Sequence, residues 1–395
     1  MRAAMPEAIA QTFVLLEEPR DRRHAGAIEA AGGKVVVARN LEHVADLAAE
    51  VDIVQFEFWN HPKLFACLAR TEFPAIRSVF WSHISGLARP VIQPGLIREA
   101  LRFVFTTEAS RNLPLLCDPH EAARNNVAVI NSGFGFAQKP TRQGPDGTPR
   151  IAYLGTVDFA KMHPGFFDAI DSLDGGDIHV VIWGSYDIDG DVVARAHAMR
   201  HRERILFAGH ADDPVTALAN AEIFFYPLQR GHYGTAENAL VEAMSLGLVP
   251  VVLNNPAEMA IVRHGETGFV ASSIEECSAL IQELSVSLEL RQLLSRNAVK
   301  HIAETRTSAR SVRDFIALWH GLLDEPKRVP NFRIVVGESP ASWFLATQCL
   351  PGETWRPLAQ PRREAPSKGE LAHFESAFPL DSSLSQLASL GTAAR

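Results

Sequence analysis

The stretch GTAENALVEAMSLGLVPVV, residues 234–252, decides the fold that we predict. Its apolar residues recur at the spacing of one packed helix face, and they are Ala236, Ala239, Leu240, Ala243 and Met244. Gly247 stands where a helix is expected to stop. The residues that follow, VPVVL, show no polar alternation, as in a parallel strand covered on both faces. We therefore predict a loop, a short helix and a buried parallel strand.

The polar residues of this stretch predict a ligand site. Thr235, Asn238 and Glu242 are three and four residues apart, so their side chains can point at one object. The N-terminus of a helix at the edge of a parallel sheet favours anions. The stretch therefore predicts a site for a phosphate-bearing ligand.

The composition is that of an ordinary globular protein. The 395 residues favour two domains, and 47% of them are hydrophobic and 21% charged. A net charge of −8 argues against a nucleic-acid partner. The four cysteines form no CxxC pair, which favours reduced thiols. No run approaches the roughly 20 apolar residues of a membrane span, so we expect a cytoplasmic protein.

Strand and helix patterns alternate along two segments. In the first segment we predict strands at residues 12–16, 35–38, 53–56, 76–81, 103–106 and 127–130. In the second we predict strands at 151–154, 178–183, 205–208, 223–226 and 249–253. The fold class that follows is α/β, with two doubly wound, Rossmann-like parallel sheets.

The composition along the chain sets the expected domain boundaries. Residues 1–138 form a first domain, the Pro- and Gly-rich residues 139–150 a linker, and residues 151–325 a second domain. A helix near residues 308–323 is expected to close the second domain. Residues 326–395 are expected to be a partly irregular extension, with a loop over 351–370 and a helix over 373–390.

The second domain opens with IAYLGTVDFAKMHP, residues 151–164. Gly155 ends the predicted strand and lets a ligand approach the backbone, while Lys161 can supply a point charge to a phosphate. The alternative is a plain turn between strand and helix with a surface lysine.

With its neighbours, this opening resembles a known family. After Gly155 and Lys161 come VVIWG ending in Gly184, RILFAGH ending in Gly209 and His210, then FFYPL, the 234–252 stretch and GETGFV. This order resembles the C-terminal domain of retaining GT-B glycosyltransferases, in particular glycosyltransferase family 4, over residues 151–323. The resemblance implies two domains facing across a cleft, a nucleotide-sugar donor, retention of anomeric configuration, and neither a metal nor another cofactor.

The resemblance also implies roles for individual residues. Lys161 matches the lysine that binds the donor diphosphate, and Thr156 stands where the family usually has an arginine. Glu242 matches the second glutamate of an E-x7-E motif, which holds the ribose; the alternative is an exposed helix carboxylate. Position 234, where the first glutamate belongs, is a glycine. The expected donor-binding set is Gly155, Thr156, Lys161, Gly184, Gly209, His210, Gly234, Thr235, Ala236, Asn238, Ala239 and Glu242.

The candidate catalytic residues are His83, Lys161 and Glu237. His83 lies in VFWSHISG just past a predicted strand, where the family often has a histidine near donor sugar and acceptor; a structural histidine is the alternative. Glu237 is five residues before Glu242, so we expect it on a different side of the helix.

Two further features leave alternatives open or point away from a site. An aromatic side chain at His232 or Tyr233 would stack on a sugar or base, or pack the loop. YDIDGDV, residues 186–192, lacks the glycine and glutamate that a calcium loop needs, so we predict a polar surface turn.

The predicted function is glycosyl transfer, of the hexosyl-transferase kind. The acceptor is a saccharide, a lipid-linked sugar or a small molecule, and a lipid-linked acceptor would bring peripheral association with the inner membrane face. Two alternatives stay open: another GT-B enzyme, such as a nucleotide-sugar epimerase or a phosphorylase, and a catalytically inactive nucleotide-binding scaffold. Gly234 in place of a glutamate favours the scaffold.

Overall fold

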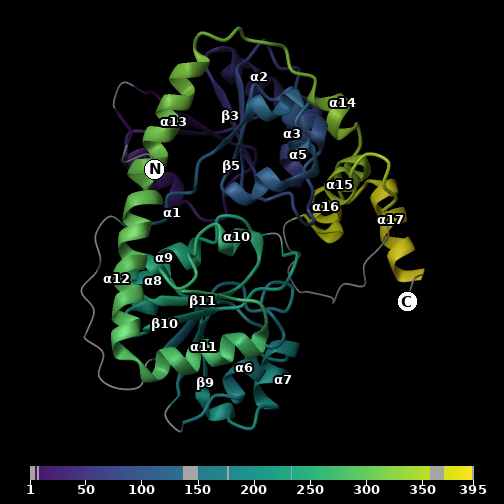
Figure 1. Ribbon diagram of the computed structural model, residues 1–395. Coiled ribbons are helices and arrows are strands. Elements are labelled where there is room, and N and C mark those ends of the chain that lie inside the picture. The colour runs from purple at the N-terminus through teal and green to yellow at the C-terminus, as the bar shows by residue number, and fades with distance from the viewer. Residues whose placement is uncertain are drawn as a thin grey trace. The chain divides into compact units, whose positions relative to one another are not determined.

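The computed structural model describes residues 5–6, 9–136, 150–175, 178–232, 234–355 and 369–393. All of the predicted linker except Arg150 lies outside these residues. The chain forms two compact α/β units: unit 1 comprises Met1–Ile130 with Val312–Arg395, and unit 2 comprises Asn131–Ser311 (Figure 1). Among the described helices, none is long and apolar enough to cross a membrane.

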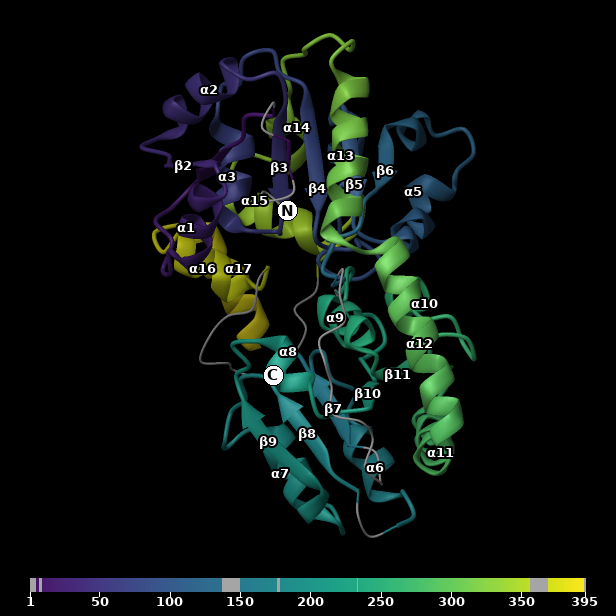
Figure 2. The ribbon, with the colours of Figure 1, turned by 90° about the vertical axis from the view of Figure 1, so that its left-hand side faces the viewer.

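Unit 2 is a doubly wound parallel sheet. Its six strands lie in the order β12-β11-β10-β7-β8-β9, and Figure 2 shows β9, β8, β7, β10 and β11 in sequence across the sheet. The order reverses between β7 and β10, and such a switch point is where open parallel sheets bind ligands, at the carboxyl ends of the strands. The strands are β7 (Ile151–Leu154), β8 (Val180–Trp183), β9 (Ile205–Gly209), β10 (Ile223–Tyr226), β11 (Val249–Leu253) and β12 (Phe269–Ala271).

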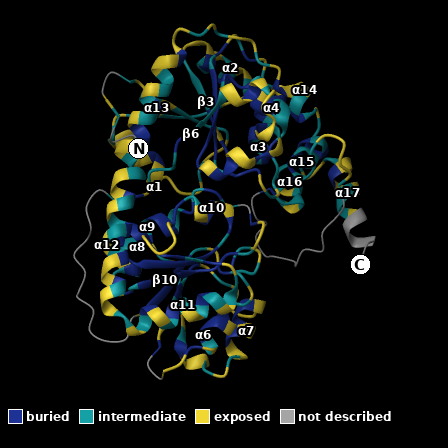
Figure 3. Ribbon diagram, in the orientation of Figure 1, coloured by how far each residue is buried: buried dark blue, intermediate teal, exposed yellow. Residues whose placement is uncertain are grey.

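Helices bury this sheet. Helix α9 packs against α8 and α12, while α6 packs against α11. All residues of β7, β10 and β11 are buried, and β10 is dark blue in Figure 3. The helices are α6 (Phe166–Asp171), α7 (Asp191–His197), α8 (Pro214–Leu218), α9 (Asn238–Leu246), α10 (Pro256–Met259), α11 (Ile274–Val286) and α12 (Leu288–Thr305), with a 3-10 turn η4 (Arg202–Arg204).

The five strands predicted for unit 2 are all present, and β12 is an additional one. Sequence patterning missed β12 because it has only three residues. The helix predicted from residues 234–252 is α9, and Gly247 ends it with a φ of +82°.

Unit 1 contains two parallel sheets. β1 (Thr12–Leu15) pairs with β2 (Lys34–Val37), and β3 (Val54–Phe58), β4 (Ser78–Ser82), β5 (Arg102–Phe105) and β6 (Val127–Val129) form the other sheet in that order. The six strands correspond to those predicted. The helices between them are α1 (Arg23–Ala30), α2 (Leu41–Ala49), α3 (Pro62–Arg70), α4 (Pro94–Glu99) and α5 (Pro114–Cys117), with 3-10 turns η2 (Glu108–Asn112) and η3 (Ala122–Asn126).

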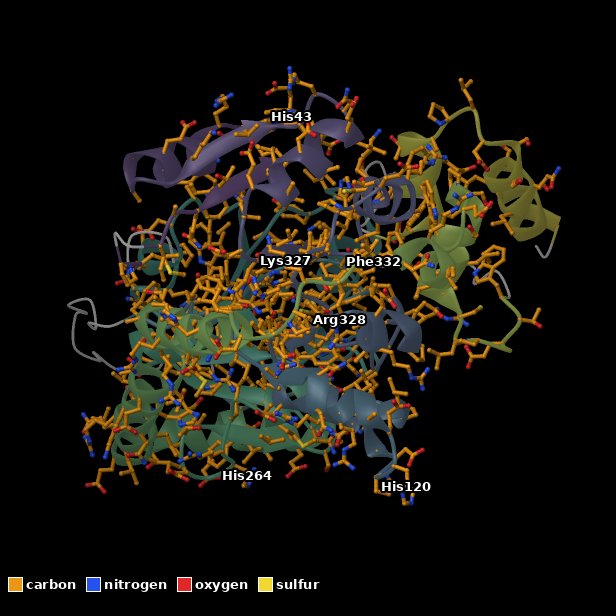
Figure 4. All side chains as sticks on the ribbon, turned by 90° about the horizontal axis from the view of Figure 1, so that it is seen from above. His43, His120, His264, Lys327, Arg328 and Phe332 are labelled. Carbon is orange, nitrogen blue, oxygen red and sulfur yellow. The ribbon has the colours of Figure 1, made fainter. Side chains whose placement is uncertain are left out.

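The C-terminal part of the chain returns to unit 1. Helix α13 (Ser308–Leu322), which we expected to close the second domain, packs instead on unit 1, where Phe315 lies 4.7 Å from Trp81 between ring centroids. Arg328 then pairs with Ile76, and Lys327 donates to the carbonyl of Val51; Figure 4 labels both residues. The predicted boundary at residue 325 therefore differs from the observed division, because apolar residues of α13 complete the core of unit 1.

The described residues of the 326–395 segment are part of this core and not only an extension. Phe332 is buried against the rings of Phe56, Phe73 and Phe80, and Trp343 and Phe374 are fully buried. The segment contains α14 (Phe332–Val336), α15 (Pro340–Gln348), α16 (Leu371–Ala377) and α17 (Ser382–Ala393). The last two replace the single helix predicted for 373–390 with two helices that are separated at residues 378–381. Most of the predicted loop, residues 356–368, lies outside the described residues.

Candidate functional site

The backbone around Lys161 is fixed at the switch point of unit 2. Lys161 follows β7, and the chain that follows β10 runs beside it. The N–H of Gln229 donates to the carbonyl of Lys161 over 2.8 Å, and the N–H of His163 donates to the carbonyl of Pro227 over 2.9 Å. These two bonds join the carboxyl ends of β7 and β10, where the doubly wound sheet predicts ligand binding.

A buried ion pair lies at this point. Nζ of Lys161 is 3.2 Å from Oε2 of Glu237, and the hydroxyl of Tyr226, the last residue of β10, donates to the same oxygen over 2.8 Å. The Lys161 side chain is 15% exposed and that of Glu237 is 1% exposed. Lys161 also lies 5.5 Å from the centroid of the Tyr226 ring. The two candidate residues Lys161 and Glu237 are therefore direct partners.

The position of Glu237 corrects our prediction. Glu237 is not on the helix but immediately before it, as the N-cap residue of α9, with a φ of +38° and a ψ of 59°. This left-handed backbone turns its side chain toward Lys161, so the spacing argument from an ideal helix does not apply to it. Thr235 also precedes the helix, so the expected helical stripe is wrong for Thr235, and only Asn238 and Glu242 are one turn apart on α9.

The Glu237 carboxyl is ionised in this environment. Burial alone raises its pKa, but the charges of Lys161 and His232 and the hydrogen bonds from Tyr226 and Lys161 outweigh burial, so the pKa is lowered. Only one carboxylate oxygen is satisfied, since Oε1 has no hydrogen-bond partner among the residues described. An isolated buried ammonium or carboxylate would be costly here, so each of these two charges depends on the other.

A second buried network holds the loop before α9. Nε2 of His232 lies 3.1 Å from Oε1 of Glu258, whose Oε1 also accepts from Nδ2 of Asn255 over 2.9 Å. The N–H of Gly234 donates to Nδ1 of His232 over 3.0 Å, so the ring contacts the loop through one nitrogen and Glu258 through the other. Tyr233 lies outside the described residues, so the stacking predicted for it has no structural counterpart here.

The sequence had not singled out Tyr226, Glu258 or Asn255. For Tyr226 a signal was available, because a polar aromatic residue at the carboxyl end of a buried strand faces the edge where ligands bind. Glu258 and Asn255 lie on and before the short α10, and nothing in their spacing connects them with His232.

Glu242 is a half-buried carboxyl on α9. Burial, and then the charge of Asp213 at the N-cap of α8, raise the pKa of Glu242 to about 7. The exposed helix carboxylate that we kept as an alternative is therefore wrong. No hydrogen bond to the Glu242 carboxyl is found within the described ranges.

The three predicted glycines end three neighbouring strands. The N–H of Gly155 donates to the carbonyl of Trp183 over 3.0 Å, and that of Gly184 donates to Gly209 over 2.8 Å. A Cβ on Gly184, whose φ is +147°, would collide with the carbonyl oxygen of Gly155. Position 184 therefore requires glycine, because the backbone of Gly155 lies close to it. Glycine allows the same close approach of a backbone at ligand-binding turns.

The remaining predicted donor residues are exposed or half-buried. The side chain of Thr156 is exposed, and its carbonyl accepts from the Tyr153 hydroxyl over 2.7 Å. His210 is exposed, 3.9 Å from Asp212. Ala236 and Asn238 line a surface hollow with Asn131, Ser132, Gly133, Phe134, Val241 and Arg306, and Ala239 is half-buried on α9.

The segment 186–192 contains the polar turn that we predicted. Residues 187–190 form a surface turn in which Oδ1 of Asp187 accepts from the N–H of Asp189 over 3.0 Å, which confirms the predicted polar turn. In the part of the chain that the structure describes, no group of three His, Cys, Asp or Glu side chains gathers as metal ligands would.

His83 belongs to a separate cluster in unit 1. It follows β4 and lies opposite Trp59, which follows β3; the two rings stack 4.2 Å apart at 14°. Nε2 of His83 is 2.8 Å from Oε2 of Glu57. Phe56 and Phe58 point into the core, so the alternation along β3 turns Glu57 and Trp59 to the opposite face. Trp59 is 40% exposed, an aromatic surface at the carboxyl edge of the sheet.

Comparison with known proteins identifies the class of fold. Residues 137–301 match the family described as Glycosyl transferases group 1. Capsular polysaccharide biosynthesis glycosyltransferase CapM of Staphylococcus aureus is 21% identical over 183 residues, which are 44% of this chain and 47% of CapM. The chain thus spans about half the length of this curated relative.

Solved structures resemble the chain over most of its length. Anabaena Alr3699/HepE in complex with UDP and glucose has a TM-score of 0.63 at 14% identity, over 79% of this chain and 92% of HepE. A glycosyltransferase from Rickettsia africae ESF-5 has a TM-score of 0.63 at 12% identity, over 80% and 91%. Sucrose-phosphate synthase (tll1590) from Thermosynechococcus elongatus has 0.55 at 14%, over 71% and 77%. The fold is the GT-B fold of glycosyltransferases, with two Rossmann-like units.

The raised pKa of Glu242 predicts a pH-dependent stability. Its folded pKa of about 7 exceeds the ordinary 4.5, so its favourable contribution is complete below pH 4.5 and is lost as the pH rises through 7. Glu242→Gln should therefore raise the free energy of unfolding more at pH 8 than at pH 5, by on the order of 2 kcal/mol. Urea unfolding at both pH values measures this. The exposed Glu283→Gln is the control, and equal effects of Glu242→Gln at both values would contradict the prediction.

Proposed function

We propose that this chain is a glycosyltransferase that moves a hexose from a nucleotide-sugar donor to a saccharide acceptor, with retention of configuration. The observation that carries the proposal is the ammonium of Lys161, fixed at the β7/β10 switch point within the residues that match the glycosyl transferase family. Retention is supported by the order of motifs that resembles family 4, from Gly155 to the 234–252 stretch.

Lys161 has the chemistry that the leaving group needs. The ammonium of Lys161 is a compact positive charge beside Glu237. This charge can neutralise the diphosphate as the bond between its oxygen and the anomeric carbon breaks, which is electrostatic stabilisation of developing charge. The acceptor oxygen forms the new bond to that carbon, and its proton passes to the departing diphosphate.

Glu242 is proposed to hold the ribose. Its carboxyl is half-buried on α9, and its two oxygens can accept hydrogen bonds from two neighbouring hydroxyls. Uridine is the proposed base, because HepE has been solved with UDP and with UDP-glucose, and TarM of S. aureus with UDP. Since Lys161 supplies a fixed positive charge, we propose that the donor binds without a metal ion.

The cluster in unit 1 supports a saccharide acceptor. The exposed Trp59 offers a flat apolar face to the C–H face of a sugar ring, while Glu57 and His83 offer hydrogen-bond partners for hydroxyls. The stack of Trp59 on His83 fixes both rings. His83 therefore has a place in acceptor binding under this proposal.

A donor screen tests the function. We expect a UDP-hexose to raise the melting temperature of the purified chain in the presence of EDTA, because a ligand that binds only the folded state stabilises it by mass action. GDP- and ADP-sugars are the comparison, and transfer or slow hydrolysis of the donor is measured by release of UDP. Binding without turnover would favour the inactive scaffold, and turnover only with a metal would refute the metal-free donor site.

Removal of the Lys161 charge should weaken donor binding. Lys161→Ala is expected to raise the Kd for UDP about 10- to 100-fold, the usual worth of a hydrogen bond to a charged group. It also leaves Glu237 buried and unpaired, which should cost about 3–5 kcal/mol of stability. The double variant Lys161→Ala/Glu237→Gln removes that cost and should keep the weak binding, as measured by titration calorimetry. The exposed Lys300→Ala is the control; an unchanged Kd in the double variant would remove Lys161 from the phosphate site.

Removal of Trp59 should affect the acceptor alone. Trp59→Ala is expected to raise the KM for the acceptor roughly tenfold, and Trp59→Phe less, because the flat apolar face is lost or reduced. Methyl glycosides of glucose, galactose and N-acetylglucosamine serve as acceptors, and donor hydrolysis without acceptor should stay unchanged. The exposed Leu206→Ala in unit 2 controls for loss of apolar surface. Equal effects on hydrolysis and transfer would contradict an acceptor role.

A further inference from the structure

We propose that Glu237 is the positioning residue of the donor site: it holds Lys161 in place, and it does so from the space that a side chain at position 234 would occupy. This inference rests on the proposed function, because Lys161 is the residue through which Glu237 acts. Three observations carry it, concerning the space at Gly234, the backbone of Glu237 and the geometry of the ion pair.

The carboxylate of Glu237 fills the side-chain space of position 234. A Cβ placed on Gly234 would collide with Oε1 of Glu237, and it would lie 2.6 Å from Nδ1 of His232. The φ of Gly234 is outside the left-handed region that favours glycine, so the backbone itself would accept other residues. Gly234 is therefore required by the Glu237 carboxylate and the His232 ring, and not by its own conformation.

Glu237 adopts a backbone conformation that residues other than glycine rarely take. Among the described residues only Asn60 and Glu237 are non-glycine residues with positive φ, and a glycine at 237 would adopt this backbone without strain. The carboxylate is also buried, with Oε1 lacking a hydrogen-bond partner among the described residues. Strain and burial of this kind persist at functional sites, where the constrained side chain is part of the mechanism.

The geometry of the pair shows what this carboxylate does. Oε2 receives both the Tyr226 hydroxyl and the Lys161 ammonium, so strand β10 orients the carboxylate and the carboxylate orients the lysine. A lysine has a flexible four-carbon stem, and the ion pair with Glu237 restricts the positions that its ammonium can take. The charge of Lys161 is enough for affinity to the donor diphosphate. Stabilisation of the leaving group additionally needs the ammonium at one defined position beside it.

This arrangement accounts for the glutamate that position 234 lacks. A side chain at 234 and the carboxylate of Glu237 in its observed position exclude each other in space, so one of them has to move if both are present. Here the carboxylate comes from position 237, three residues along the loop. The site therefore keeps one carboxylate beside Lys161, and Gly234 is no sign of lost activity.

Glu237→Gln separates positioning from binding. It keeps the size of the side chain and removes the charge that fixes Lys161. We expect kcat with UDP-glucose, or with the UDP-hexose found in the donor screen, to fall at least tenfold, while the Kd for UDP stays within about threefold of wild type, because the bound diphosphate supplies the countercharge that Lys161 loses. A kcat within twofold of wild type would overturn the inference, and so would a loss of UDP affinity equal to the loss of kcat.

Glu222→Gln is the matched control. Glu222 lies just before β10, at the opposite end of the strand from Tyr226, and forms a buried ion pair with Arg291 at 2.9 Å. The same loss of charge from a buried pair in the same unit should lower the melting temperature and leave kcat within twofold. If Glu222→Gln lowered kcat as much as Glu237→Gln does, loss of stability would explain both effects and the positioning role would fall.

A second pair of variants tests the shared space without any activity. Gly234→Ala should lower the melting temperature of the wild type by several degrees, and clearly less in a Glu237→Gly background, where the carboxylate is gone. Equal losses in the two backgrounds would overturn the shared-space argument, because the clash with the His232 ring alone would then account for them. If wild type turns over no donor, the proposed function fails; if wild type is active and Glu237→Gln is equally active, only this inference fails.

Discussion

The buried pair of Lys161 and Glu237 is the interaction on which the arrangement of unit 2 depends at its carboxyl edge. Two charges removed from water stabilise a protein only when each finds the other in good geometry. Here that geometry comes from three separate parts of the chain: the loop after β7, the end of β10 and the residue before α9. The pair therefore connects the loop after β7, the end of β10 and the residue before α9 at one point.

The second network explains how the strained residue keeps its position. Glu258 and Asn255 hold His232, and His232 accepts from the N–H of Gly234, so the loop is anchored three residues before Glu237. A left-handed glutamate would relax if its loop were free, at a gain of roughly 1–2 kcal/mol. The anchored loop on one side and the start of α9 on the other leave it no such freedom. The anchored loop and the start of α9 therefore hold the Glu237 carboxylate in place despite the strain in its backbone.

The sequence predicted the strands well because buried parallel strands have uninterrupted runs of apolar residues. The helix within 234–252 was predicted from the spacing of its apolar residues, and the structure has it as α9. The prediction failed for α13, because a helix pattern says that a helix forms and not which unit receives its apolar face. It also failed for Glu237 and Thr235, because periodicity extended an ideal helix one turn too far. A left-handed residue before a helix leaves no periodic signal, and a partner such as Tyr226 is close in space but eleven residues away.

In this site, the residue type at one backbone position and the location of the side-chain atoms lead to different conclusions. By position, the glycine at 234 removes a carboxylate, which favoured an inactive scaffold. By atom, a carboxylate is present beside Lys161, because a side chain from 237 reaches the space above the glycine. The left-handed backbone of Glu237 directs its side chain back toward position 234, which a helical backbone over these three residues would not do. Loss of a residue from one backbone position is therefore weak evidence for loss of chemistry wherever a neighbouring position can deliver the same group to the same point.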